Sequence, residues 1–192
     1  GCPLPCPAPP RRLSVRPGPP SPGYPDDFAP LCRRRGEEEQ ARALLAQGEK
    51  YLAAAQAAWD GEWYRRGYYD DGAPLGSRES DQCQIDSIAQ SFSVLPQGAD
   101  RGRADRAVSA ALDRLFDRER GIVRLFDPAF DAGGSQDPGY IKSYPPGVRE
   151  NGGQYTHAAV WLALACFRLS RPEEGWEVRA TVTGNTLHSR QH

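Results

Sequence analysis

Residues 138–159 read PGYIKSYPPGVRENGGQYTHAA and join a loop rich in glycine and proline to the start of a helix. From this junction onward, apolar residues recur three or four positions apart, which is the spacing of one helix face. They are Tyr155, Ala158, Ala159, Leu162, Ala165, Cys166 and Leu169. The preceding connection, 117–151, is long for a helical domain. Connections of this length are usually functional or disordered.

Three further helices are predicted upstream of this loop. The apolar periodicity places them within 37–58, 85–95 and 104–116. The first should end at Asp60-Gly61, because glycine readily adopts the left-handed conformation of a helix cap. The second should end before Pro96. Between these two helices, residues 62–69 predict a short extended segment, with a turn at 70–72.

Helices that alternate with long loops predict an all-α fold with long Gly/Pro-rich loops. The loops are too long and too aromatic for a simple up-and-down bundle, so we expect part of a larger array of helix pairs. The irregular segments then gather at one set of helix ends, where binding sites are commonly built.

Both ends of the chain differ in composition from the centre. Residues 1–27 hold ten of the eighteen prolines and predict a disordered or polyproline-like segment. Such a segment could be a ligand for an aromatic-lined peptide-binding domain, or it could be a linker or tail. Residues 178–192 are polar and predict a divergent tail.

Charge and composition exclude several classes of function. The 24 Lys and Arg residues nearly balance the 25 Asp and Glu residues, so no global basic field exists to hold nucleic acid or anionic lipid. No apolar run of the roughly 18 residues that span a membrane occurs, and the N-terminal segment does not resemble a signal peptide. We therefore expect a cytoplasmic protein that neither spans a membrane nor is secreted. The five cysteines, Cys2, Cys6, Cys32, Cys83 and Cys166, lack the spacings of a zinc site or disulfide scaffold, so free thiols and no metal are expected.

Two polar clusters precede the long loop. Residues 59–77 set aromatic rings beside Asp70 and Asp71, a combination suited to sugars, whose C–H faces stack on rings while their hydroxyls need directional partners. The alternative is a core-packed hairpin with a solvated turn. Further along, Asp86 and Gln90 lie four residues apart on one face of the predicted helix. They could bind a substrate, or they could cap and bridge neighbouring loops.

The third cluster is the loop and helix start of 138–159. It contains Lys142, Arg149, Glu150, Asn151 and His157. Cationic groups beside a helix N-terminus could bind an anion, and Glu150 could bind hydroxyls. His157 could equally be a structural residue. Phosphate-binding loops, dinucleotide fingerprints and nucleophile elbows are absent from the sequence.

Three stretches together resemble a known family. WDGEWYRRGYYDDGAPLGS, QCQIDSIAQSF and DPGYIKSYPPGVRENGGQYTHAAVW occur in this order and are similar to the catalytic domain of glycoside hydrolase family 94, formerly glycosyltransferase family 36. The resemblance covers about 28–177 and is strongest to the phosphorylase-like region of cyclic β-1,2-glucan synthases. It implies a partial (α/α)6 barrel.

The resemblance also implies a reaction and a set of site residues. Family members carry out inverting phosphorolysis of β-glucosidic bonds, in which an acid protonates the leaving oxygen while phosphate attacks the anomeric carbon. The implied sugar-binding residues are Glu150, Gln90 and Asp86, and His157 is the implied phosphate-binding residue. Phosphate is then a co-substrate, with no other cofactor, and the second partner is a β-linked gluco-oligosaccharide.

One departure from the family concerns catalysis. The family's general acid is an Asp in a G-D-W-N-D segment upstream of the similar stretches, and no such segment occurs here. The sequence therefore predicts a fragment with sugar and phosphate contacts but without a catalytic residue. Its apolar helix faces could support association. The alternative is a non-catalytic glucan-binding or interaction remnant.

Overall fold

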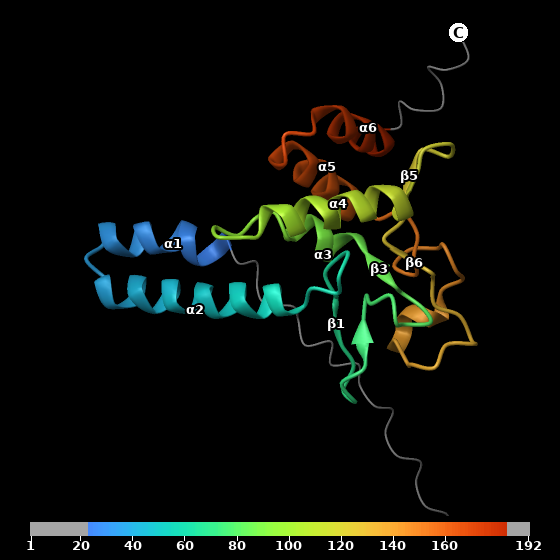
Figure 1. The fold of residues 1–192 in the computed structure, drawn as a ribbon, viewed down its shortest axis with the longest axis horizontal. Coiled ribbons are helices and arrows are strands. Elements are labelled where there is room, and N and C mark those ends of the chain that lie inside the picture. The colour runs from blue at the N-terminus through green and yellow to red at the C-terminus, as the bar shows by residue number, and fades with distance from the viewer. Residues whose placement is uncertain (1–22, 184–192) are drawn as a thin grey trace, which may run out of the picture.

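The computed structural model describes residues 23–183 and is built mainly of helices (Figure 1). The helices are α1 (Gly23–Arg34), α2 (Glu38–Ala57), α3 (Ser87–Phe92), α4 (Arg101–Leu115), α5 (Thr156–Arg168) and α6 (Pro172–Val182), with a 3-10 helix η1 (Gly139–Ser143). Three antiparallel strand pairs join β1 (Gly67–Tyr68) to β2 (Pro74–Leu75), β3 (Ile85–Asp86) to β6 (Phe126–Asp127), and β4 (Phe116–Asp117) to β5 (Ile122–Val123). The prediction of an all-α fold is confirmed only in part, because the structure is mostly helical but also has three short strand pairs, and the barrel stays a prediction.

The main core lies where α3, α4, α5 and α6 meet. Helix α4 forms because Asp100 caps it, accepting a hydrogen bond from Arg103 N at 2.9 Å, and because its apolar residues fall on one face. That face is buried and consists of Ala104, Ala107, Val108, Ala111, Leu112 and Leu115. Helix α5 buries Leu162 and Cys166 in the same core. The predictions of helices over 104–116 and 155–169 are confirmed to within a few residues.

Helices α1 and α2 form a hairpin that extends away from this core (Figure 1). Their contact is a small apolar cluster of Ala29, Cys32 and Ala41. The far end of α2 reaches the rest of the molecule at Gln56, whose Oε1 accepts a hydrogen bond from Tyr64 Oη at 3.1 Å. The 37–58 helix prediction is thus confirmed, although α2 ends at Ala57, before the Asp60-Gly61 turn.

Three elements differ from the sequence predictions. Helix α1 occupies 23–27, which the composition assigned to a disordered segment; residues 1–22 lie outside the described part. Residues 85 and 86 form β3 rather than the start of a helix, so the second helix begins at Ser87. Helix α6 was not predicted, because only Gly175, Val178 and Thr181 of its residues are buried and its composition is polar.

The short strands lie in the connections between α2 and α3 and between α4 and α5. Strand β1 lies in the extended segment predicted for 62–69, and the predicted turn at 70–72 connects it to β2, which was not predicted. The apolar run 122–126 supplies β5 and the start of β6, so it crosses from one strand pair to another. Within 23–183, no helix combines the length and apolar character needed to cross a membrane. Cys32, Cys83 and Cys166 are buried free thiols, as expected, whereas Cys2 and Cys6 lie outside the described residues.

Candidate functional site

The segment 150–157 enters α5 and is anchored by Asn151. This side chain is fully buried, and its Oδ1 accepts a hydrogen bond from Phe130 N at 2.8 Å. Its Nδ2 donates to Phe130 O at 2.8 Å and to Tyr144 O at 2.7 Å. Asn151 therefore joins three loop segments, and its amide is engaged by protein.

Gly152 and Gly153 follow Asn151, at a place where the backbone is crowded. Gly152 has a φ of +76°, in the left-handed region that favours glycine. At Gly153, a Cβ would stand 2.8 Å from Arg149 O and 2.9 Å from Gly147 O. Any larger residue at 153 would push the loop apart, so the Gly-Gly pair is required by packing.

Gln154 completes the anchor on the other side. Its Oε1 accepts from Val123 N at 2.9 Å and its Nε2 donates to Thr181 O at 3.4 Å, so it ties the segment to β5 and α6. Gln154 was not among the candidate residues predicted from the sequence. Its only signal was its position between Gly153 and the helix.

Glu150 and His157 differ from Asn151 and Gln154, because their side chains do not hydrogen-bond this segment to its neighbours. The Glu150 carboxylate oxygen Oε2 is buried and has no hydrogen-bond partner among the described residues. The nearest cation is Arg149, with Nε 4.0 Å from that oxygen. His157 is exposed in the first turn of α5, and its ring lies beside Tyr155 and Trp161, with centroids 5.5 Å and 6.0 Å away.

The N-terminus of α5 adds electrostatic character to this place. Tyr155, the N-cap residue, makes no side-chain cap hydrogen bond. First-turn N–H groups of a helix carry partial positive charge and bind anions when side chains do not occupy them. His157 and this helix end together form a surface suited to an anion.

Asp86 and Gln90 are brought together, but inside the protein. Gln90 is fully buried; its Oε1 accepts from Tyr64 N at 2.8 Å, while its Nε2 donates to Tyr64 O at 3.0 Å and Asp86 O at 2.8 Å. The four-residue spacing predicted that Asp86 and Gln90 lie on one face of a helix. The structure contradicts this, because Asp86 precedes α3. It is the N-cap, accepting from Ile88 N at 2.8 Å and Ala89 N at 3.1 Å. In this conformation both side chains are engaged by protein.

The environment of Asp86 is electrostatically mixed. Burial raises the pKa of its carboxyl above the ordinary value, although the Arg66 guanidinium and the two backbone N–H groups act in the opposite direction. Arg66 Nε lies 3.6 Å from Asp86 Oδ1. Ring contacts link this region to the candidate anion site. Phe92 of α3 packs on Trp161 of α5, with ring centroids 4.8 Å apart, and Trp161 in turn contacts the ring of His157.

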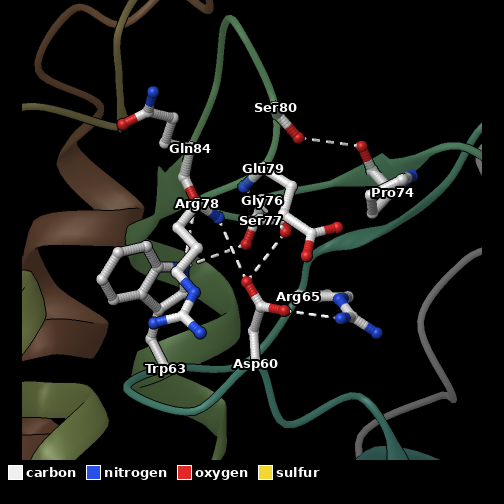
Figure 2. A network of polar contacts seen from close by, with 10 residues as sticks. All are labelled: Asp60, Trp63, Arg65, Pro74, Gly76, Ser77, Arg78, Glu79, Ser80 and Gln84. Carbon is white, nitrogen blue, oxygen red and sulfur yellow. Dashed lines mark hydrogen bonds and ion pairs between the residues drawn. The ribbon is translucent and has the colours of Figure 1, made fainter.

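The aromatic cluster of 59–77 forms a hairpin held by a polar network (Figure 2). Trp63 is buried, and its Nε1 donates to Gly76 O at 3.1 Å and Gln84 O at 2.9 Å. The buried carboxylate of Asp60 accepts from Ser77 Oγ at 2.8 Å and Arg78 N at 3.1 Å, and pairs with Arg65 at 2.5 Å. Trp63 and Asp60 are thus structural, as the core-packed alternative predicts.

The Asp60 network predicts a pH-dependent stability. Burial opposes ionisation, but the hydrogen bonds from Ser77, Arg78 and Arg65 outweigh it and hold the Asp60 pKa below its ordinary value of 3.8. Because the folded pKa is the lower one, the stabilisation is complete above the unfolded pKa and is lost as pH falls through the folded pKa. We expect Asp60→Asn to lower the free energy of unfolding by about 1–3 kcal/mol at pH 7, and by progressively less below about pH 4.

Urea unfolding followed by circular dichroism between pH 7 and pH 3 measures this difference. The control is Asp113→Asn, an exposed position on α4, which should change stability little at any pH. A difference for Asp60→Asn that stays constant across the range would contradict the role of the ionised carboxylate.

A metal centre finds no support in the geometry: across 23–183, no group of three or more His, Cys, Asp or Glu side chains is arranged to hold an ion. The loop and helix end hold a Glu150 carboxylate whose buried Oε2 accepts no hydrogen bond from the described residues, and an exposed His157 imidazole in the first turn of α5.

The chain belongs to the glycosyl hydrolase 94 superfamily, whose catalytic domain matches residues 24–190. This match is longer at both ends than the 28–177 of the sequence resemblance. The chain is 52% identical over 154 residues to the cyclic beta-(1,2)-glucan synthase NdvB of Rhizobium meliloti (strain 1021), covering 78% of this chain and 5% of that protein.

Two phosphorylases are also similar. The 3-O-beta-D-glucopyranosyl-beta-D-glucuronide phosphorylase of Paenibacillus borealis is 32% identical over 149 residues, covering 77% of this chain and 19% of that protein. The N,N'-diacetylchitobiose phosphorylase of Vibrio furnissii is 29% identical over 160 residues, covering 78% and 19%. The chain therefore spans about a twentieth of the glucan synthase and about a fifth of each phosphorylase.

Proposed function

We propose that this chain forms the part of an inverting β-glucan or β-oligosaccharide phosphorylase domain that holds the donor sugar and phosphate. The observation that carries the proposal is the buried Glu150 oxygen, which has no hydrogen-bond partner within the described residues although Asn151 and Gln154 around it are engaged. A buried carboxylate oxygen without a partner is costly unless a ligand supplies one. Sugar hydroxyls are donors that satisfy a carboxylate.

His157 supplies the second half of the site. Its imidazole and the uncapped N-terminus of α5 offset the charge of a bound phosphate. In the proposed reaction, phosphate attacks the anomeric carbon from the face opposite the leaving oxygen, so it must be held beside the sugar. Glu150 fixes the sugar and His157 the nucleophile.

We propose that Asp86 and Gln90 support sugar binding from buried positions, by holding neighbouring backbone in place. Both are buried, and Gln90 fixes the backbone of Tyr64 while Asp86 caps α3. Helix α3 packs on α5 through Phe92 and Trp161, so its position bears on His157. We assign no general acid among these residues.

Two substitutions separate the proposed roles. We expect Glu150→Gln to weaken glucose binding by about tenfold and to change phosphate binding little, because the charged acceptor is lost while its shape is kept. We expect His157→Ala to do the reverse. Calorimetric titration of the 192-residue chain with glucose and with inorganic phosphate measures both affinities.

The matched control for Glu150→Gln is Glu62→Gln, an exposed position in the turn after α2, which should change neither affinity. Equal losses of both ligands in both variants would overturn the assignment of roles. A parallel assay for sugar 1-phosphate, with β-1,2- and β-1,4-linked gluco-oligosaccharides and phosphate, tests turnover. Binding without turnover would favour the non-catalytic glucan-binding alternative.

A further inference from the structure

A cavity of about 260 Å³ lies beside the β1–β2 hairpin, away from the residues assigned above. The hairpin contributes Tyr69, Ala73 and Pro74, the following loop contributes residues 79–82, and the far wall is Phe130, Ser135 and Gln136. Neither Glu150 nor His157 is among these lining residues. The aromatic cluster singled out in the sequence therefore borders a hollow that the proposed function does not use.

The two walls are fastened to each other across a long stretch of sequence. Ser135 N donates to Asp81 Oδ2 at 2.7 Å, and Gln82 Nε2 donates to Asp131 Oδ1 at 2.5 Å. A third bond runs from Gln136 Nε2 to Asp71 Oδ2 at 3.2 Å. These bonds hold the cavity open before any ligand arrives, which lowers the entropic cost of binding.

One side of the cavity is apolar and aromatic. Phe130 is 4% exposed and packs on Phe126, with ring centroids 4.9 Å apart. Tyr69 packs against the same apolar cluster. Burial, together with neighbouring carboxylates, raises the pKa of the Tyr69 hydroxyl, so this group stays neutral and both donates and accepts hydrogen bonds.

The other side of the cavity is polar and acidic. Glu79 and Asp81 line it, and hydrogen bonds from Ser135 lower the pKa of Asp81, which keeps that carboxyl ionised. None of the described residues that line the cavity is Lys, Arg or His. Negative lining disfavours phosphate and other anions, whereas carboxylates and amides accept and donate hydrogen bonds to hydroxyls.

We propose that this cavity binds an uncharged glucosyl unit of an oligosaccharide, at a site separate from Glu150 and His157. Aromatic walls contact the C–H faces of the sugar ring, and the carboxylates and amides contact its hydroxyls. The volume is below the roughly 300–1,000 Å³ of pockets for drug-sized molecules, which suits one sugar ring. The choice of a glucosyl unit rests on the proposed function.

The cavity shares a structural element with the first site. Asn151 precedes the Gly-Gly pair and follows Glu150, and it binds both the N–H and the carbonyl of Phe130. The backbone that carries Glu150 and the backbone that carries the cavity wall are thus fixed to one another. An oligosaccharide unit held in the cavity would lie at a constant position relative to Glu150.

The test uses Ala73→Leu, which fills the cavity but leaves the backbone bond from Tyr69 N to Ala73 O intact. We expect the β-1,2-linked disaccharide of glucose to shift the NMR signals of Ser135 N–H and the Gln136 side-chain amide in the 192-residue chain. Ala73→Leu should weaken this binding by at least about tenfold. The control is Ala54→Leu, the same substitution at an exposed position on α2, which should leave binding unchanged.

A second variant keeps the test decisive if Ala73→Leu does not fold. Glu79→Gln at an exposed rim position preserves shape, and we expect it to weaken the disaccharide by about three- to tenfold. The Glu150→Gln, His157→Ala double variant should retain the shifts at Ser135 and Gln136, even if the proposed function fails. Shifts confined to 150–157, or shifts at the cavity caused by Ca²⁺ but not by the disaccharide, would overturn the proposal.

Discussion

Replacing Asn151 with alanine should lower the free energy of unfolding by about 3 kcal/mol or more, one of the two largest effects expected in this chain. The side chain is fully buried and makes three hydrogen bonds, two with Phe130 and one with Tyr144. Alanine leaves one N–H and two carbonyl groups without these partners, and each unsatisfied buried group costs about 1–3 kcal/mol.

Urea unfolding followed by circular dichroism provides the measurement, with Gln97→Ala as the control. Gln97 is an exposed amide in the turn before α4, so its loss should change stability by less than about 0.5 kcal/mol. Because Asn151 also fixes the backbone beside Glu150, glucose affinity should fall in Asn151→Ala under conditions where the chain is still folded. A loss of stability below about 1 kcal/mol would show that the loops hold together without this amide.

Helix α4 was predictable because its apolar residues form a single face that is buried in the main core. Helix α5 was predictable from the buried residues Ala158, Ala159, Leu162, Ala165 and Cys166, which keep the 3.6-residue period, although Val160, Leu164 and Phe167 of the same helix are exposed. Helix α6 was not predictable in this way. It is held through Val178 and Thr181, whereas Trp176 on its outer side is 58% exposed, so its apolar residues follow no single stripe.

The positions of Asp86 and Gln90 show when sequence spacing does not predict which residues share a helix face. Four-residue spacing places two side chains on one helix face only if both residues are helical, and Asp86 belongs to β3 because it pairs with Phe126, far along the chain. Gln90 likewise binds the backbone of Tyr64, 26 residues before it. Local periodicity carries no information about such contacts, so tertiary structure decides the role of both residues.

The candidate site was only partly accessible from the sequence. The pattern of 138–159 marks a polar loop entering a helix, and from that alone Glu150, Asn151 and His157 are equally good candidates. The structure distinguishes them. The Asn151 amide is hydrogen-bonded to neighbouring loops, whereas the buried Glu150 Oε2 has no hydrogen bond and His157 is exposed. Their assignment to sugar and phosphate stays a prediction that rests on the family resemblance.

Replacing Trp63 with alanine should lower the free energy of unfolding by about 4 kcal/mol. The indole is 1% exposed in the main core, and the Arg114 guanidinium lies over it, with Cζ 4.6 Å from the ring centroid. Trp63→Phe should cost about 1–2 kcal/mol, because it keeps most of the apolar contact but loses the Nε1 bonds to Gly76 O and Gln84 O (Figure 2).

The measurement for Trp63 is urea unfolding by circular dichroism, since tryptophan fluorescence itself changes with the substitution. The matched control is Trp176→Ala, which removes the same side chain from an exposed position on α6 and should cost less than about 1 kcal/mol. Nε1 joins the carbonyl of Gly76, beside β2, to that of Gln84, beside β3, and so adds to the backbone bond from Gly76 N to Cys83 O that links the same two segments. Equal losses in Trp63→Ala and Trp176→Ala would mean that the hairpin docks without the indole, and the polar network around Asp60 would then be the element that positions it.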